Sequence, residues 1–289
     1  MFYSIEDLVA QAKDYPSVSE LMIATEMAHG GYSRERIIET MEKNLAVMKQ
    51  SVAEGIAGVT SVTGLTGGDA TRLNDYIHSG NFLSGETILQ AVRNAIAVNE
   101  VNAKMGLICA TPTAGSAGVV SGVLLAVIDR LKLTHQQQLD FLFTAGAFGL
   151  VIANNASISG AEGGCQAECG SAAAMASAAV VEMMGGTPKM SLDAAAIVFK
   201  NILGLVCDPV AGLVEIPCAK RNSSGAISAL CTADLVMAGV KSKIPFDDAL
   251  SAMYKVGRSL PAALRETAQG GVAVTKAGLM LKKKVFGDN

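Results

Sequence analysis

An alanine-rich stretch between about Ala167 and Met184 constrains the fold more than any other part of the sequence. Alanine has the highest helix propensity, and the pair Gly185-Gly186 that follows is typical of a helix end. Half of all residues are hydrophobic but only 4% are aromatic, so small side chains supply most of the apolar bulk. Because small side chains let helix backbones approach closely, we expect a mainly α fold.

Capping signals divide the rest of the chain into further helices. The patterns Ser17-x-x-Glu20 and Thr134-x-x-Gln137 are capping-box signatures. Further helix starts are predicted where a cap or a proline precedes a helical pattern: Ser4, Ser33, Asp69, Ser84, Ser191, Asn222, Pro245 and Pro261. No linker or repeat interrupts this pattern, so we expect a single helical domain over residues 1–289.

The charge balance gives no reason to expect a nucleic-acid or membrane partner. The formal net charge is −3, and the apolar stretches are too short or too interrupted to span a bilayer. Residues 1–7 lack the basic and apolar regions of a secretory signal, which favours a cytoplasmic protein. Charged residues make up only 17% of the chain, which suggests a buried interior and a large contact with another chain.

Two loops rich in glycine and threonine are candidates for binding a carboxylate. The first contains Thr66, Gly67 and Gly68 and leads into the helix expected at Asp69. A helix N-terminus after small residues offers free N–H groups and a positive dipole to an anion. The alternative is a plain helix cap with Asp69 at the N-cap position. The second loop has the same chemistry and includes Thr111, Pro112, Thr113, Ala114, Gly115 and Ser116.

Cys165, Cys207 and Cys218 each lie within two residues of a glycine or proline. The backbone can approach a bulky ligand at such breaks. Their spacing excludes zinc ribbons and ferredoxins, and three thiolates would leave one iron of a four-iron cluster open as a Lewis acid. Cys169, one helical turn after Cys165, is a weaker candidate for a fourth ligand. The alternative is a set of scattered core cysteines in an alanine-rich protein.

The segments around these cysteines resemble the iron–sulfur L-serine dehydratases. The resemblance rests on Gly163-Gly164-Cys165-Gln166-Ala167-Glu168, Leu205-Val206-Cys207-Asp208-Pro209-Val210 and Ile216-Pro217-Cys218-x-x-Arg221-Asn222. The two Gly/Thr loops and Glu266-Thr267-x-x-Gly270-Gly271 are also similar to that family. The resemblance covers essentially the whole chain, and by length the chain is similar to the separate α chain of the two-subunit type.

The resemblance implies a multi-helix catalytic domain packed around an oxygen-sensitive [4Fe–4S] cluster. Such an enzyme deaminates L-serine to pyruvate and ammonia in amino-acid catabolism, without pyridoxal phosphate. Cys165, Cys207 and Cys218 would hold the cluster, and its open iron would polarise the serine hydroxyl. Single-chain relatives end in a cysteine, whereas no cysteine follows Cys231 here. The family's Ser/His-containing segment would lie on a separate β chain, so we expect a heterodimer or larger assembly in which this chain alone is inactive.

Arg221 and Glu162 are the predicted catalytic residues. Arg221 could bind the substrate carboxylate with two parallel hydrogen bonds from its guanidinium group. The alternative is that Arg221 forms a salt bridge to Asp208 or Glu215. The base could be Glu162, Lys220 or a residue of another chain. The predicted substrate-binding residues are those of the two loops and the asparagine after Arg221: Thr66, Gly67, Gly68, Thr113, Ala114, Gly115, Ser116 and Asn222.

Two other functions fit the same sequence. One is a related cluster-dependent lyase that releases sulfide from L-cysteine. The other is a helical subunit whose cluster is structural or sensory and catalyses nothing. Comparing pyruvate release from L-serine and from L-cysteine distinguishes a serine dehydratase from the first alternative. A cluster whose spectrum does not change when serine is added would favour the second.

Overall fold

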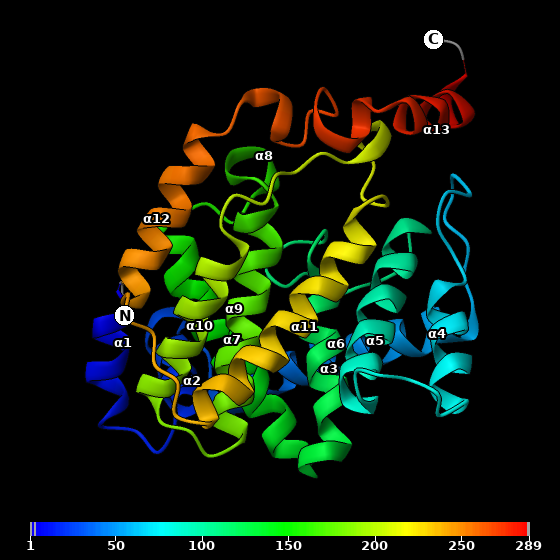
Figure 1. Cartoon of the computed structure of the whole chain (residues 1–289). Coiled ribbons are helices and arrows are strands. Elements are labelled where there is room, and N and C mark those ends of the chain that lie inside the picture. The colour runs from blue at the N-terminus through cyan, green and yellow to red at the C-terminus, as the bar shows by residue number, and fades with distance from the viewer. Residues whose placement is uncertain (1, 3, 288–289) are drawn as a thin grey trace.

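The computed structural model describes residues 2 and 4–287, and α-helices dominate this part of the chain (Figure 1). Thirteen helices follow one another in it: α1 (Ile5–Ala12), α2 (Val18–Gly30), α3 (Arg34–Ala57), α4 (Asp69–His78), α5 (Glu86–Ala103), α6 (Ala117–Leu131), α7 (His135–Asn155), α8 (Gly160–Gly163), α9 (Cys165–Met183), α10 (Pro188–Ile202), α11 (Cys218–Met237), α12 (Phe246–Ser259) and α13 (Lys276–Phe286). Three short 3-10 turns, η1 (Val210–Gly212), η2 (Ala262–Leu264) and η3 (Gly271–Val274), complete the list. The mainly α prediction is confirmed.

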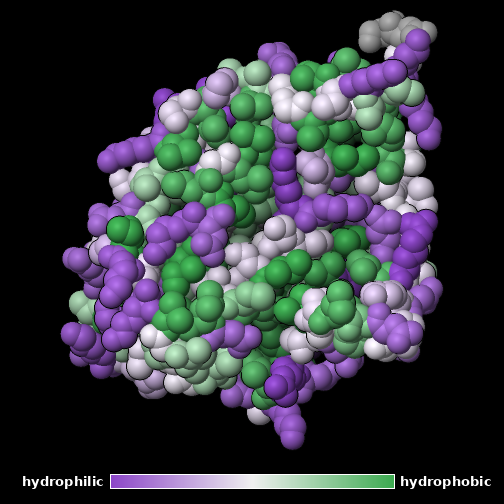
Figure 2. Space-filling view, in the orientation of Figure 1, coloured by the Kyte–Doolittle hydropathy of each residue, from purple (hydrophilic) through white to green (hydrophobic). Residues whose placement is uncertain are grey.

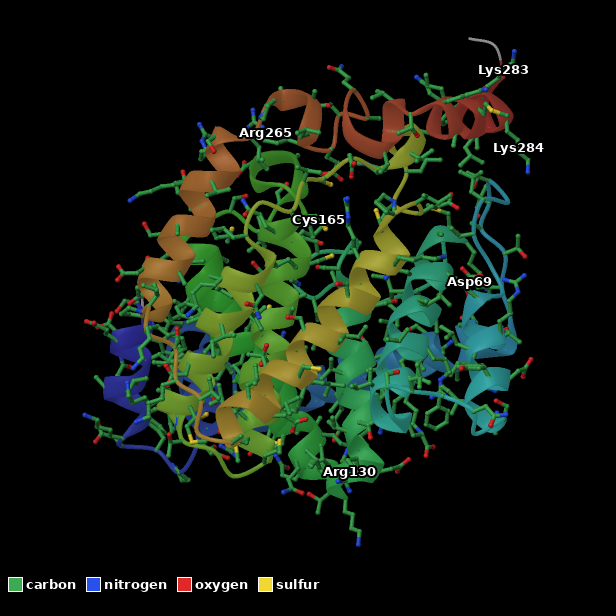
Figure 3. The ribbon with its side chains drawn as sticks, in the orientation of Figure 1. Asp69, Arg130, Cys165, Arg265, Lys283 and Lys284 are labelled. Carbon is green, nitrogen blue, oxygen red and sulfur yellow. The ribbon has the colours of Figure 1, made fainter. Side chains whose placement is uncertain are left out.

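The last part of the chain crosses one end of the helix bundle. After α12, residues 261–275 run over the end at which α8 lies and lead into α13 (Figure 1). We call these residues the crossing segment. In Figure 3, Arg265 marks the crossing segment, and Lys283 and Lys284 mark the far end of α13.

The surface of the molecule mixes polar and apolar side chains. Figure 2 shows apolar residues over much of the face on which α11 lies, with hydrophilic residues around them. Ile227 and Leu235 of α11 are among the exposed large apolar side chains. None of the helices in the described ranges is both long enough and apolar enough to cross a membrane.

Four predicted N-caps are confirmed. The side-chain oxygens of Ser4, Ser17, Ser33 and Thr134 each accept the N–H of the third residue of the following helix. Such a cap stabilises a helix by about 1 kcal/mol. Glu20 does not complete the capping box with Ser17, because its carboxylate pairs with Arg34 at 2.5 Å instead.

Three predicted helix starts are wrong. Helix α10 begins at Pro188 instead of Ser191, because Thr187 caps it and a proline is preorganised for the first helical position. Helix α11 begins at Cys218, so Asn222 lies inside the helix and does not cap it. No α-helix follows Pro261 directly, because the crossing segment forms the turns η2 and η3.

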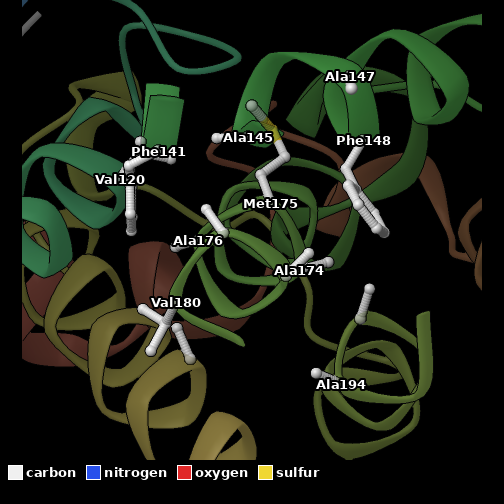
Figure 4. Close-up of a cluster of buried hydrophobic side chains, with 14 of the residues drawn as sticks. Val120, Phe141, Ala145, Ala147, Phe148, Ala174, Met175, Ala176, Val180 and Ala194 are labelled. Carbon is white, nitrogen blue, oxygen red and sulfur yellow. The ribbon is translucent and has the colours of Figure 1, made fainter. Parts of the chain in front are cut away.

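The alanine-rich helix α9 is the centre of the core. It packs against α6, α7, α10 and α11, and 16 of its residues are buried. Figure 4 shows Ala174, Met175, Ala176 and Val180 of this helix facing side chains from the surrounding helices. A helix that is apolar on all sides is stable only when other helices enclose it, as here.

Glycine permits the close crossing of α5 and α6. A Cβ atom added at Gly118 would lie 2.3 Å from the carbonyl oxygen of Ala95, whereas one added at Gly146 of α7 would meet nothing within 4 Å. We expect Gly118→Ala to lower the free energy of unfolding by about 1–3 kcal/mol because the α5 backbone must move. Gly146→Ala should raise it by about 0.5–1 kcal/mol through helix propensity. Urea denaturation measures both values, and equal effects would contradict this explanation.

The half-buried carboxylate of Glu182 joins three helices and makes stability depend on pH. It accepts the N–H of Val18, the first residue of α2, at 2.9 Å and also the hydroxyl of Thr144 in α7. Burial raises the pKa of Glu182 above its ordinary value of 4.5. Because the folded state then holds this proton more tightly than the unfolded chain, the carboxyl contributes stability below pH 4.5 that is lost as the pH rises through the raised pKa. We expect the unfolding free energy of wild type, relative to that of Glu182→Gln, to fall in urea titrations as the pH rises above 4.5. Parallel pH curves for the two proteins would show that this carboxyl does not titrate.

Candidate functional site

The predicted cysteines gather at the end of the bundle beneath the crossing segment. Cys165 is the first residue of α9, Cys218 is the first residue of α11, and Cys207 lies in the loop before η1. Figure 3 shows Cys165 at this end of the molecule. The side chains of Cys165, Cys169 and Cys207 form one buried cluster, and the thiol of Cys218 is close enough to interact electrostatically with that of Cys165.

The surroundings of Cys207 and Cys218 favour the protonated form of both thiols. Burial, reinforced by the nearby Cys165 and Glu168, raises the pKa of Cys218 to about 12. Burial and Cys165 also raise the pKa of Cys207 well above its ordinary value. Metal binding would therefore have to displace these protons, as it does in other thiolate sites.

The cysteine thiols are contributed by three separate segments of the chain. Among the described residues, no group of three or more His, Cys, Asp or Glu side chains could hold one metal ion. A four-iron cluster is larger than a single ion, and its cysteine ligands lie correspondingly farther apart. A buried set of soft sulfur donors spread over three segments is compatible with such a cluster.

The crossing segment fixes the backbone of Cys207. The N–H of Cys207 donates to the carbonyl of Leu264 at 2.9 Å, and the N–H of Glu266 donates to the carbonyl of Cys207 at 2.7 Å. Glu266 has a φ of 64°, a left-handed conformation that few residues other than glycine adopt. This strained turn directs the chain back over the cysteine loop.

Arg221 links the segments that carry the cysteines. Its Nη1 donates to the carbonyl of Val206 at 2.9 Å and lies 2.7 Å from Oδ1 of Asp208. The other oxygen of Asp208 accepts the N–H of Val272 in the crossing segment at 2.6 Å. The salt bridge to Asp208 is thus present. Substrate binding by Arg221 stays a prediction.

The loop containing Thr66, Gly67 and Gly68 is held by carboxylates of the chain itself. The Thr66 hydroxyl donates to Glu215 at 2.8 Å, and the first N–H of α4 donates to Glu100 at 2.7 Å. Burial raises the pKa of Glu100. The helix N-terminus expected to receive a substrate carboxylate therefore already binds a side chain, with Gly68 rather than Asp69 at the N-cap. Substrate binding by this loop stays a prediction.

The second loop contacts Glu168 of α9, the residue three positions after Cys165. The Thr113 hydroxyl donates to Oε1 of Glu168 at 2.5 Å, and the Ser116 hydroxyl donates to the carbonyl of Thr111 at 3.1 Å. A Cβ atom at Gly115 would lie 2.5 Å from the same Glu168 oxygen. Ala114 lies in this loop and uses its carbonyl to accept the N–H of Ala117 at 3.4 Å.

Asn222 clamps this second loop to α11. Its Nδ2 donates to the carbonyl of Gly115 at 2.7 Å and to that of Cys218 at 3.0 Å. Its Oδ1 accepts the N–H of Gly118 at 3.1 Å. Because these bonds occupy a fully buried side chain, the structure gives Asn222 a positioning role, and contact with the substrate stays a prediction.

Of the two acids that flank Cys165, only Glu168 is placed among the site residues. Glu162 lies on α8 and is exposed, and Lys220 is exposed and paired with Asp69 at 2.5 Å. Burial raises the pKa of Glu168. The sequence does hold a signal for Glu168, because a helix that begins at Cys165 has the residue three positions later on the same face.

Comparisons with known proteins agree on one family. The description of the matching family model is "Serine dehydratase alpha chain", and it covers residues 13–273. The sequence is 58% identical over 288 residues to a probable L-serine dehydratase, alpha chain, of Bacillus subtilis (strain 168), with 99% of this chain and 96% of that protein covered. It is 42% identical over 268 residues to the L-serine dehydratase, alpha chain, of Peptoniphilus asaccharolyticus, covering 92% and 91%. An L-serine dehydratase of Streptomyces coelicolor is 43% identical over 182 residues, which are 62% of this chain and 40% of that protein.

Proposed function

Since this chain belongs to the serine dehydratase alpha-chain family, we propose that it is the catalytic α chain of an L-serine dehydratase. The enzyme would be a lyase that converts L-serine to pyruvate and ammonia in the cytoplasm. The observation that carries the proposal is the family match over residues 13–273 together with the three cysteines that gather beneath the crossing segment.

Cys165, Cys207 and Cys218 would hold a [4Fe–4S] cluster. Two observations support this assignment: the thiols are buried or half-buried, and they come from three separate segments. When bound, an iron with an open position would supply the Lewis acid that a poor leaving group such as hydroxide needs, in place of pyridoxal phosphate.

The reaction is a β-elimination, and the residues of this chain would bind and orient the substrate. The Cα–H and Cβ–O bonds break, and the aminoacrylate released tautomerises and is hydrolysed to pyruvate and ammonia. Arg221 places a positive charge beside the cysteines, since Cys165 and Asp208 outweigh the effect of burial and raise its pKa. This charge is suited to the substrate carboxylate.

A separate β chain would complete the site. The names of the B. subtilis and P. asaccharolyticus relatives include "alpha chain", and the chain matches only part of the longer relative from S. coelicolor. A base that removes the Cα proton works best where water is excluded. Because Glu162 is exposed in this chain, the β chain would either cover Glu162 or supply the base itself.

Anaerobic reconstitution of the α chain with iron and sulfide, alone and with its β chain, tests the proposal. We expect pyruvate from L-serine only with both chains present, and no inhibition by aminooxyacetate, which captures pyridoxal phosphate. Full activity of the α chain alone would overturn the two-chain assignment. Pyruvate from L-cysteine but not from L-serine would favour the desulfidase alternative. A metal-free protein with full activity in air would overturn the cluster assignment.

A further inference from the structure

Three acceptor atoms from different segments surround Gly160 at the cysteine end of the bundle. A Cβ atom added to this glycine would lie 2.9 Å from Sγ of Cys207, 3.2 Å from Oε2 of Glu266 and 3.3 Å from Oε2 of Glu168. The sulfur belongs to the loop before η1, and the two carboxylates belong to the crossing segment and to α9. Negative groups thus converge beside a predicted cluster ligand.

Glu168 is held in a fixed orientation within this group. Its Oε1 accepts the Thr113 hydroxyl at 2.5 Å, and Gly115 packs so closely on that oxygen that a larger residue at this position would displace it. Its Oε2 is the oxygen that approaches Gly160. One carboxylate oxygen is therefore used by the protein, while the other faces the position next to Cys207.

These two carboxylates lack an ion-pair partner among the described residues. In the described part of the chain, no lysine or arginine forms an ion pair with Glu168 or Glu266. Two basic residues of α11 are engaged elsewhere, Arg221 with Asp208 and Lys220 with Asp69. Burial and the neighbouring Glu266 both oppose the charge on Glu168. A cation placed between the two acids would relieve this repulsion.

We propose that Glu168 binds the ammonium group of the amino-acid substrate. The hydroxyl of Thr113 holds the Glu168 carboxylate in place for this contact. This inference rests on the proposed function, because L-serine brings an ammonium group that can pair with the Glu168 carboxylate. A charge-assisted hydrogen bond from the ammonium to a largely buried carboxylate favours amino acids over hydroxy acids of the same shape. Glu168 is then a specificity-determining residue for the reaction.

The test compares L-serine with L-glycerate, which has the same carboxylate and β-hydroxyl but a hydroxyl in place of the ammonium. In the reconstituted complex of both chains, we expect Glu168→Gln to raise the KM for L-serine roughly 10- to 100-fold. The inhibition constant of L-glycerate should change less than about twofold, because its binding uses no ammonium contact. Glu168→Asp keeps the charge and should recover part of the affinity for serine.

The iron and sulfide content of each variant provides a readout that does not depend on turnover. Glu168→Gln should bind as much iron as the wild type. Glu182→Gln is the matched control, because it removes a half-buried carboxylate from the same helix away from the cysteines, and it should leave the KM for L-serine unchanged.

Three results would overturn the assignment: an equal loss of serine and glycerate binding, a fall in kcat with an unchanged KM, or a loss of iron from Glu168→Gln. The fall in kcat alone would make Glu168 a proton acceptor rather than an ammonium ligand. A wild-type complex that makes no pyruvate from L-serine would instead refute the proposed function, so the two failures are distinguishable.

Discussion

We expect Cys207→Ser to lose iron on reconstitution and to lower serine dehydration at least ~100-fold. A serine hydroxyl is a hard, weakly acidic donor that does not replace a soft thiolate. Because the core around α9 does not include this side chain, the variant should keep its helical far-UV circular dichroism. Iron and sulfide analysis and a pyruvate assay measure the two effects.

The other cysteines provide controls of the same chemistry. Cys231 is exposed on α11 and Cys109 precedes the second loop, and serine at either position should leave the iron content unchanged. Cys169→Ser decides whether the protein supplies a fourth ligand, because its thiol contacts Cys165 inside the same buried cluster. Retention of iron and activity by Cys207→Ser would show that Cys207 is not a ligand.

Replacing Asp208 with alanine should lower the free energy of unfolding by about 3–5 kcal/mol, because it leaves the Arg221 guanidinium buried without its partner. The side chains of Arg221 and Asp208 are only 17% and 3% exposed, so water cannot replace the lost contact well. The N–H of Val272 loses its acceptor in the same variant. Urea denaturation of the metal-free chain measures the loss without any contribution from bound iron.

A surface ion pair gives the matched control for Asp208. Asp69 pairs with Arg72 and Lys220, whose side chains are 73% and 61% exposed. Asp69→Ala should therefore cost less than about 1 kcal/mol. Replacing Asp208 and Arg221 together with leucine and methionine should recover part of the stability lost in Asp208→Ala, because no unpaired charge stays buried. A cost below about 1 kcal/mol for Asp208→Ala would show that the pair does not hold the segments together.

Local signals predicted the helices well because a cap acts within one turn. Ser4, Ser33 and Thr134 each bind an N–H three residues away, and this relation is visible in the sequence. The crossing segment was not predictable in the same way. Its backbone pairs with Cys207, nearly sixty residues earlier, and only the folded chain brings the two together.

The candidate site likewise combines features that local sequence predicts with contacts that only the folded chain makes. The breaks beside Cys165, Cys207 and Cys218 are local, and the structure brings these segments to one end of the bundle. The occupation of the α4 N-terminus by Glu100 depends on a contact between two helices that no sequence pattern specified. The residue at which α9 begins also decides whether Glu168 can be predicted as a site residue. A helix beginning at Cys165 rather than Ala167 puts Glu168 on the face of Cys165.

The pairing of Cys207 with the crossing segment has a consequence for how the protein is made. During synthesis Cys165, Cys207 and Cys218 leave the ribosome well before Leu264 and Glu266 do. Until those later residues emerge, the Cys207 backbone lacks both of its hydrogen-bond partners. Under the proposed cluster assignment, iron delivered before that point would meet thiols that are not yet in position, so we expect cluster insertion to follow the emergence of the crossing segment.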